Sequence, residues 1–394
     1  MQLSPEKIAE IRERSDIGQI IGEHVALKRL GRSLKGLCPF HSEKTPSFTV
    51  SPEKQVFFCF GCRASGDVFG FLMKVDGRSF PEVARSLAER AGVEIPVEDA
   101  RENVQAREER ARKERLLAAT DVAAGFYLRM LREHPLGHFA RDAIDARQVS
   151  PDVAATYRLG YAPHGWDALS KHLAQKGVAA RDAEDAGLIV PRKSGDGHYD
   201  RFRHRLMFPI ADVHGHVVAF SGRTLPTPPG ESEPPDPPAK YVNSPEGPLY
   251  HKGELLFGLH EARVELRRST IALLCEGNFD VVSIHQAGHK NVVAPLGTAF
   301  TLAQAKLLRR YVATVVLVFD GDAAGRKATA AAFPLLQEVG LAAKVVALPR
   351  GEDPDSFVRA RGRAALTSLI EAARPIVEHL IEGAADAAGP DPAA

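Results

Sequence analysis

Val312 to Lys327 reads VATVVLVFDGDAAGRK, and this stretch decides the fold. Within it, Val315 to Phe319 is a short apolar run, rich in β-branched residues, which is typical of a strand buried on both faces. The run stops at Asp320, and a helical pattern continues to about Leu336. Open α/β sheets bind ligands where parallel strands end and helices begin, so this junction is a candidate site. The simpler alternative is that Asp320 ends the strand and Asp322 caps the helix.

A second apolar run favours the ligand-binding interpretation. Thr270 to Leu274 is followed by Glu276, and Asp280 lies at the start of the next predicted helix. Between the two runs the sequence predicts a helix, a strand and a helix, at residues 279–286, 291–295 and 301–310. This alternation requires parallel strands joined by right-handed crossovers. We therefore expect Glu276, Asp320 and Asp322 at one edge of a parallel sheet.

Three carboxylates at one edge repel one another unless a cation neutralises them. Mg²⁺ is the expected ion, because it prefers oxygen ligands and keeps waters that substrate phosphates can replace. One or two ions are expected, with Mn²⁺ as an alternative. A further acidic turn, Gly351 to Asp355, follows another apolar run. Additional ligands could come from Asp280, Asp353 and Asp355.

These residues resemble the Toprim fold, which bacterial primases, topoisomerases and some nucleases share. Glu276 matches its strand-end glutamate, and Asp320 with Asp322 match its D-x-D pair. The resemblance spans Ile271 to Asp355 and implies that these three acids are catalytic and hold the metal.

Two pairs of residues near the amino end have the spacing of a zinc site. Cys38 and His41 form one pair and Cys59 and Cys62 the other, each with a two-residue gap. Thiolate and imidazole ligands suit tetrahedral Zn²⁺, and four protein ligands close its coordination sphere, so one structural zinc ion is expected. The alternative is that these are buried cysteines with this spacing by chance. A helix is predicted over residues 3–22 before the pairs.

Cys38 to Phe48, CPFHSEKTPSF, resembles the Cys-His-Cys-Cys zinc ribbon at the amino end of bacterial DNA primases. Between the pairs lie lysines and phenylalanines, namely Lys44, Lys54, Phe48, Phe57 and Phe58. They suit a face that binds single-stranded nucleic acid, but most of the phenylalanines also suit the core of so small a domain.

The expected fold is therefore α+β and multidomain: a zinc ribbon with flanking helices, then a mixed α/β core with a Toprim parallel sheet and a helical tail. The expected domains are a zinc-binding domain, a charged helical linker, a basic subdomain, the Toprim subdomain and a helical tail, at 1–96, 97–115, 116–268, 269–355 and 356–394.

Basic residues before the Toprim segment are candidates for binding nucleic acid or nucleotide. Arg201, Arg203 and Arg205 alternate at the entry of a predicted strand, which would place them on one face, and Arg223 lies beyond it. A solvated strand face is the alternative. The resemblance to primases adds Lys240 and Lys252 for nucleotide and template, and Arg147 in a motif that departs from the usual pattern.

Composition sets few further limits. The formal net charge is +1, so any nucleic-acid surface must be local. No apolar run is long enough to span a membrane, and the polar amino end is unlike a signal peptide, so we expect the cytoplasm. In that reducing compartment, four cysteines favour metal ligands or core residues over disulfides.

The combined resemblance implies a DNA primase, a nucleotidyltransferase that synthesises short RNA primers on single-stranded DNA from ribonucleoside triphosphates. It implies a nucleoid-associated, monomeric enzyme. Full-length primases also carry a domain that docks on the replicative helicase, and too few residues follow Asp355 to contain it. Many relatives have an aromatic residue and then Met after the Toprim glutamate motif, whereas this chain has Asn278 and Phe279.

Two other classes of protein remain open. A Toprim topoisomerase or nuclease would need a catalytic tyrosine on a DNA-gate domain, and none of the seven tyrosines lies in a recognisable one. A non-catalytic, zinc-dependent adaptor for single-stranded DNA would carry the acids without using them. Mg²⁺-dependent nucleotide incorporation distinguishes the adaptor from the primase.

Overall fold

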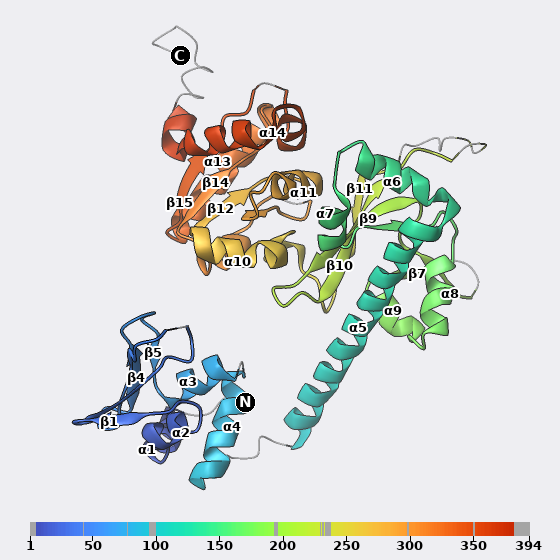
Figure 1. The fold of residues 1–394 in the computed structure, drawn as a ribbon. Coiled ribbons are helices and arrows are strands. Elements are labelled where there is room, and N and C mark those ends of the chain that lie inside the picture. Colours follow the sequence, from blue (N-terminus) through green and yellow to red (C-terminus); the bar gives the residue numbers. More distant parts are fainter. Residues whose placement is uncertain are drawn as a thin grey trace. The chain divides into compact units, whose positions relative to one another are not determined.

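The computed structural model describes residues 5–381, except 42, 77, 94–99, 193–195, 229, 231, 233–237, 298 and 350. It divides into two compact units, Met1–Glu108 and Glu109–Ala394 (Figure 1). The first residues of the predicted linker, 97–99, and the tail beyond residue 381 lie outside the described residues.

The smaller unit is built on an antiparallel sheet in the order β1-β2-β3-β4-β5. Its strands are β1 (Lys28–Leu30), β2 (Ser33–Gly36), β3 (Phe48–Ser51), β4 (Val56–Cys59) and β5 (Ser65–Gly66), and its helices are α1 (Pro5–Glu13), α2 (Ile17–Gly22), α3 (Val68–Val75) and α4 (Phe80–Ala91). The single helix predicted over 3–22 is wrong. Asp16 has an extended backbone and caps α2 by accepting a hydrogen bond from the Gln19 amide at 2.9 Å, which separates α1 from α2.

The phenylalanines of this sheet divide between its two faces. Phe48 and Phe57 are buried and stack with ring centroids 5.3 Å apart, so the core interpretation is correct for them. Phe58 and Phe60 are 39% and 72% exposed and pack against each other. Because successive side chains of a strand point to opposite faces, β4 presents an aromatic surface to solvent as well as to the core.

The charged stretch after the smaller unit is helical, as predicted, but it does not end at residue 115. It continues as one helix, α5 (Ala100–Glu133). In this helix Arg112 and Arg115 form ion pairs with Asp185 and Asp182 at 2.8 and 3.0 Å, which tie the predicted linker to the larger unit. Even this helix is too polar to span a bilayer, and no other described helix is long and apolar enough to do so.

The first part of the larger unit contains a four-stranded antiparallel sheet in the order β11-β10-β9-β6. Its strands are β6 (Gly160–Ala162), β9 (Arg205–Ala211), β10 (Val217–Thr224) and β11 (Tyr241–Asn243). Around it lie η1 (Pro135–Gly137), α6 (His138–Asp145), α7 (Pro151–Thr156), α8 (Ala168–Gln175), α9 (Ala180–Asp185) and the pair β7 (Ile189–Pro191) and β8 (His198–Asp200). The strand predicted to follow the alternating arginines is confirmed as β9, and it pairs with β10 in antiparallel orientation.

The second part of the larger unit is the predicted parallel sheet. Its order is β13-β12-β14-β15-β16, and only β16 (Arg374–Pro375) runs antiparallel. The parallel strands are β12 (Ile271–Leu274), β13 (Val292–Val293), β14 (Thr314–Leu317) and β15 (Ala342–Val345). The helices are η2 (Lys252–Glu254), α10 (Leu259–Ser269), α11 (Asn278–Gln286), α12 (Leu302–Arg309), α13 (Ala323–Glu338) and α14 (Pro354–Glu371).

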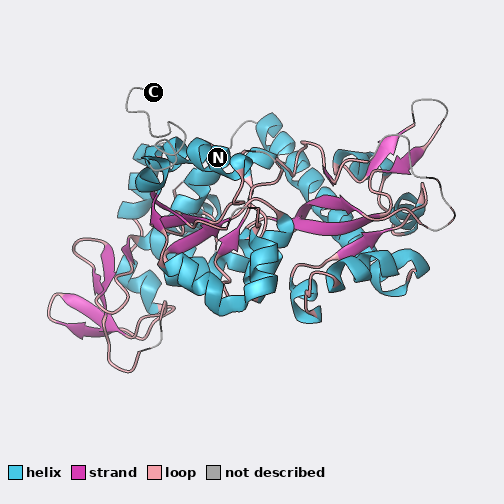
Figure 2. Ribbon diagram, turned by 90° about the horizontal axis from the view of Figure 1, so that it is seen from above, coloured by secondary structure: helices cyan, strands magenta, loops and turns pink. Residues whose placement is uncertain are grey.

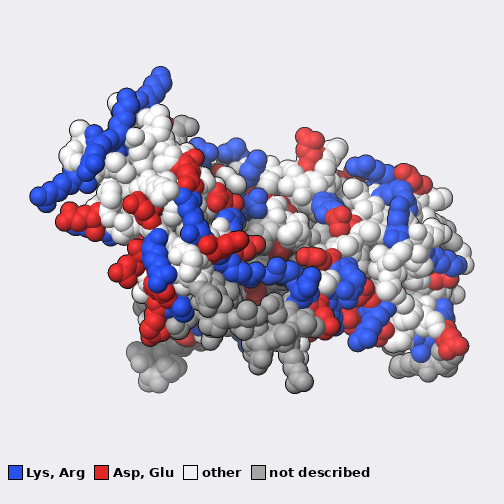
Figure 3. Space-filling model, turned by 90° about the horizontal axis from the view of Figure 1, so that it is seen from below, with Lys and Arg blue, Asp and Glu red and all other residues white. Residues whose placement is uncertain are grey.

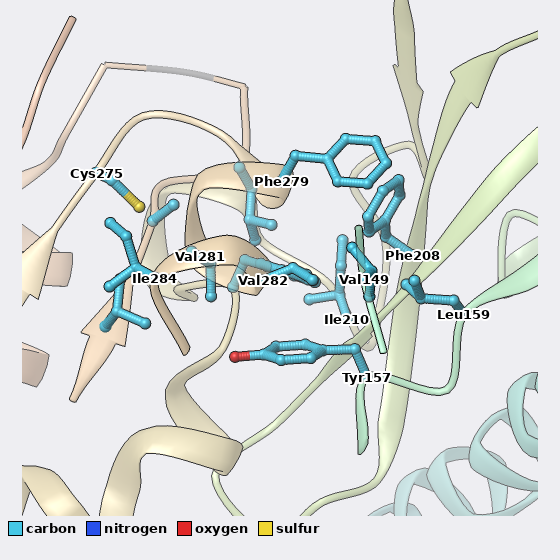
Figure 4. Packing of buried hydrophobic residues seen from close by; sticks show 14 of the residues in the cluster. Val149, Tyr157, Leu159, Phe208, Ile210, Cys275, Phe279, Val281, Val282 and Ile284 are labelled. Carbon is cyan, nitrogen blue, oxygen red and sulfur yellow. The ribbon is translucent and has the colours of Figure 1, made fainter. Parts of the chain in front are cut away.

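Helices cover both faces of this parallel sheet (Figure 2). Leu273 and Val316 point to a core shared with α11 and α14, whereas Leu274 and Leu317 point to a core shared with α10, α12 and α13. The strands are therefore apolar on both faces, which explains their unbroken apolar runs. The first of these cores also includes β9 residues such as Phe208, which tie the antiparallel sheet to α11 (Figure 4).

Candidate active site and zinc centre

The carboxyl ends of β12 and β14 bring two predicted acids together. These strands are direct neighbours, with Leu274 opposite Leu317. Glu276 follows β12 and Asp320 follows β14, and the Asp320 amide donates a hydrogen bond to Glu276 Oε1 at 3.2 Å. The two side chains therefore share one edge of the sheet, as the sequence predicted.

Asp322 lies at the same edge and begins the next helix. Its side chain accepts a hydrogen bond from the Gly325 amide at 2.8 Å and so caps α13. Asp322 is exposed. Burial of Glu276, with a smaller contribution from the charge of Asp322, raises the pKa of Glu276. A Cβ on Gly325 would lie 2.1 Å from the Asp320 carbonyl oxygen, so only glycine lets the helix start this close to the strand end. Both readings of Asp322, as a cap and as part of an acidic cluster, fit the structure.

The acidic edge carries an excess of negative charge. Burial, together with the charges of Glu276, Asp353 and Asp322, raises the pKa of Asp320 to about 6, and Lys240 opposes the shift. Burial and the same kind of repulsion raise the pKa of Asp280 to about 8. These acids offer oxygen ligands only, and their mutual repulsion is what a bound divalent cation relieves. The side chains at this edge therefore fit Mg²⁺.

The supporting acids are already engaged by the protein. Asp280 accepts hydrogen bonds from the amides of Gly277 and Asp355, at 2.9 and 3.2 Å. The Asp355 carboxylate is 3% exposed and accepts hydrogen bonds from Ser283 Oγ at 2.5 Å and from Arg359 Nε at 3.2 Å. Asp353 caps α14 through the Ser356 amide. Asp355 in particular connects α11 with α14, a role that the sequence did not predict.

A cavity of about 260 Å³ opens beside the acidic edge. It is lined by Arg147, Arg223, Lys240, Tyr241, Glu276, Gly277, Phe279, Asp280, Asp320, Asp353 and Asp355. Three of the predicted basic residues thus line one cavity together with the predicted acids, and we call it the acidic–basic cavity. Lys252 is not among its described lining residues; it begins η2, and its amide donates to Glu246 Oε1 at 3.0 Å.

The four predicted zinc ligands converge in the smaller unit. Among the described residues, Cys38, His41, Cys59 and Cys62 are the one set of potential ligands whose atoms all lie within 4.8 Å of one another. The closest approaches include 3.8 Å between the Cys38 and Cys62 sulfurs and 3.9 Å between Cys59 Sγ and His41 Nδ1. The three thiols and one imidazole fit a closed tetrahedral zinc site.

Surrounding groups orient these ligands. Glu43 lies 3.2 Å from His41 Nε2 and accepts hydrogen bonds from the Cys38 amide and Ser47 Oγ. An acid on the far nitrogen of a ligating histidine fixes the ring and leaves Nδ1 for the metal. Although burial opposes it, hydrogen bonds from Ser47 and nearby amides lower the pKa of the Cys59 thiol to about 6, which favours the thiolate that zinc binds.

Sequence reasoning missed the orienting role of Glu43, although the residue stands in the quoted motif. Gly61 is also required, because a Cβ there would lie 2.6 Å from His41 Nε2. The two-residue gap between Cys59 and Cys62 therefore needs glycine as well as the correct length.

Comparison with known proteins agrees with this arrangement. Three family models match in order: the CHC2 zinc finger over residues 3–103, the N-terminal domain of the DNA primase catalytic core over 126–263, and a Toprim-like domain over 273–358. The solved primase of Aquifex aeolicus, comprising its zinc-binding and RNA polymerase domains, is 36% identical, with a TM-score of 0.61 over 95% of this chain and 87% of that one. The chain belongs to the DnaG-type DNA primase family.

Other primases support the same placement. DNA primases of Pseudomonas putida and Halalkalibacterium halodurans are each 42% identical, over 95% and 92% of this chain. The RNA polymerase domain of Mycobacterium tuberculosis primase DnaG is 36% identical over 69% of this chain and 87% of that one, with a TM-score of 0.63. The chain spans 56% and 58% of the length of the two curated primases, which is little more than half.

A second cavity, of about 480 Å³, lies in the primase-core part of the larger unit. Arg201 and Arg203 line it together with Trp166, which is 58% exposed. The guanidinium carbon of Arg203 lies 4.1 Å from the centroid of the Trp166 ring system. Three of the predicted basic residues, since Arg205 also lines this cavity, thus gather beside an exposed aromatic side chain.

The predicted reason for this grouping is wrong. Arg201 and Arg203 belong to a loop between β8 and β9, and only Arg205 is in a strand. Arg205 is buried and donates hydrogen bonds to the carbonyls of Gly222 and Ala239 at 2.9 and 3.0 Å. The loop, rather than strand alternation, directs the two other arginines to the cavity. On the face drawn in Figure 3, basic and acidic side chains are interspersed.

Proposed function

We propose that the chain synthesises short RNA primers on single-stranded DNA by Mg²⁺-dependent nucleotidyl transfer. The observation that carries this proposal is the acidic–basic cavity. It combines metal-binding carboxylates at a Toprim sheet edge with three cations that suit phosphates, in a chain that covers 87% of a solved primase at 36% identity. Neither feature alone separates polymerisation from other Toprim chemistry.

Each side chain of the cavity has a role in this scheme. Glu276, Asp320 and Asp322 would hold the metal, and Asp280, Asp353 and Asp355, which line the same cavity, would supply further oxygen ligands. A Mg²⁺ ion held by these carboxylates would supply Lewis-acid chemistry, which favours deprotonation of the attacking 3′-hydroxyl and departure of diphosphate. Lys240, Arg147 and Arg223 line the same cavity, where they would bind the triphosphate of the incoming nucleotide.

The template is proposed to contact the cavity beside Trp166. Arg201 and Arg203 supply charge for phosphates, and the exposed ring offers a surface for stacking a base. A related DnaG catalytic domain, 35% identical, has been solved bound to single-stranded DNA. Lys252 is proposed as a further template contact outside both cavities. The proposed setting is the nucleoid in the cytoplasm, and docking on a replicative helicase would require a further domain.

In the smaller unit, Cys38, His41, Cys59 and Cys62 are proposed to hold one structural zinc ion. The exposed rings of Phe58 and Phe60 suit contact with the bases of the DNA template.

The test is incubation with single-stranded DNA, labelled ribonucleotides and Mg²⁺. We expect the native chain to make short RNA and Asp320→Asn to make at least about a hundredfold less, because the substitution keeps the shape but removes a ligand charge. Glu338→Gln is the matched control, since this acid is exposed at the other end of α13. Equal RNA from Asp320→Asn and the native chain would contradict the metal assignment. No RNA from the native chain would favour the adaptor.

A further inference from the structure

Phe279 occupies an unusual position in the acidic–basic cavity. It is the second residue of α11, only 4% exposed, and its ring packs edge to face against Phe208 of β9 with centroids 5.0 Å apart. Figure 4 shows the two rings side by side between the helix and the strand. The ring is therefore fixed by the core on one side while it lines the cavity on the other.

Two guanidinium groups lie against this one ring. The central carbon of Arg147 is 4.1 Å from its centroid and that of Arg223 is 5.1 Å away. The two arginines come from different parts of the chain, one before α7 and one on β10. An aromatic ring attracts cations to its electron-rich face, so Phe279 draws two like charges together inside the cavity.

Arg147 and Arg223 differ in the contacts that they make besides the Phe279 ring. Asp355 Oδ2 lies 3.5 Å from Arg147 Nε and so restrains that guanidinium from a second direction. Among the residues that the structure describes, Arg223 has no side-chain hydrogen bond or ion pair. Burial and the charge of Arg147 lower the pKa of Arg223, and Tyr241 and Asp355 oppose that shift. The Phe279 ring is therefore a direct contact that restrains the Arg223 guanidinium in the cavity.

We propose that Phe279 is a positioning residue for nucleotide binding: its ring holds the guanidiniums of Arg147 and Arg223 where they bind the phosphates of the incoming ribonucleoside triphosphate. This inference rests on the proposed function of the cavity. A methionine, the residue that the family resemblance leads one to expect here, has no ring to attract cations.

The test replaces Phe279 in two separate variants. One carries 3,4,5-trifluorophenylalanine, which keeps the shape of the ring but lowers the electron density on its faces, and the other carries Met. Binding of ATP is measured by calorimetry in Mg²⁺ buffer without DNA, and KM and kcat are measured in primer synthesis. We expect the Kd and KM for ATP to rise about threefold for the fluorinated residue and about tenfold for Phe279→Met. kcat should stay within about twofold, because the ring does not touch the reacting atoms.

Phe257 provides the matched control. It is buried in the same core, with its ring against Phe208 and Tyr157, and no described cation lies over it. Trifluorophenylalanine at this position should leave the Kd for ATP unchanged. In the double variant Arg147→Gln/Arg223→Gln, fluorination of Phe279 should have no further effect, because the charges that the ring holds are gone.

An unchanged Kd for ATP in both Phe279 variants would overturn the proposal, as would a fall in kcat with KM constant. A fluorination effect that persists in the double variant would also overturn it. These outcomes are separate from a failure of the proposed function, since that failure appears as an absence of RNA in the native chain, whereas ATP binding still reports on the ring.

Discussion

At the scale of single residues, burial decides which groups are charged. His285 of α11 is 8% exposed, and its Nδ1 lies 3.0 Å from the Tyr157 hydroxyl. Burial and the nearby charge of Lys290 lower its pKa from 6.5 to about 4. The folded protein therefore keeps this imidazole neutral at pH values where the unfolded chain already binds a proton.

This difference predicts an acid-sensitive fold. Between pH 6.5 and about 4 the unfolded state takes up more protons than the folded state, so stability falls as the pH drops through that window. His285→Asn, which keeps a polar group near the Tyr157 hydroxyl, should flatten the fall in melting temperature. The exposed His214→Asn should not. This assignment would be refuted if the melting temperature fell equally steeply between pH 6.5 and 4 in the native chain and in His285→Asn.

At the scale of elements, the start of α13 combines a structural and a chemical function. The Asp322 carboxylate caps the helix by accepting a hydrogen bond from the Gly325 amide at 2.8 Å. The same carboxylate contributes negative charge to the acidic edge. Substitutions can separate these functions, because serine caps a helix nearly as well as aspartate but carries no charge.

Asp322→Ser should keep the melting temperature of the larger unit but lose primer synthesis. Asp322→Ala should lose primer synthesis and also about 1 kcal/mol of stability, the usual cost of a missing cap. Thermal unfolding with circular dichroism, run beside the primer assay, measures both. Full activity in Asp322→Ser would show that the carboxylate serves only as a cap.

At the scale of the whole molecule, two units have different sources of stability. The smaller unit has a compact core around Phe48, Phe57 and Phe71 and a cluster of four zinc-type ligands. The larger unit has its own cores on both faces of the parallel sheet. In small zinc modules metal binding supplies much of the folding free energy.

Removal of zinc should therefore unfold the smaller unit alone. A strong chelator should abolish hydrogen-exchange protection in β3 and β4 and leave that of β12 and β14 unchanged. Cys62→Ser should reduce the bound zinc measured by mass spectrometry. Cys275→Ala should not, since Cys275 is buried beside Glu276 and outside the ligand cluster. Loss of protection in both units would show that they do not fold independently.

Local patterns predicted much of this protein. The two-residue gaps identified Cys38 and Cys59 as members of one cluster, because ligand spacing within a short turn depends on few residues. The apolar run before Asp320 predicted a strand that ends at the edge of a parallel sheet. The same reasoning failed for Arg201, because its periodicity matched a strand while the chain there forms a loop.

The sequence by itself therefore determined the family, the zinc-ligand cluster and the acidic edge, all of which follow from short-range spacing and chain order. Only the tertiary structure decided which of the candidate side chains are used in internal contacts and which line a cavity. It buried Arg205 against backbone carbonyls, engaged Asp355 with Arg359 and Ser283, and placed Arg147 and Arg223 on one ring. These choices depend on which distant elements pack together, and local sequence patterns do not contain that information.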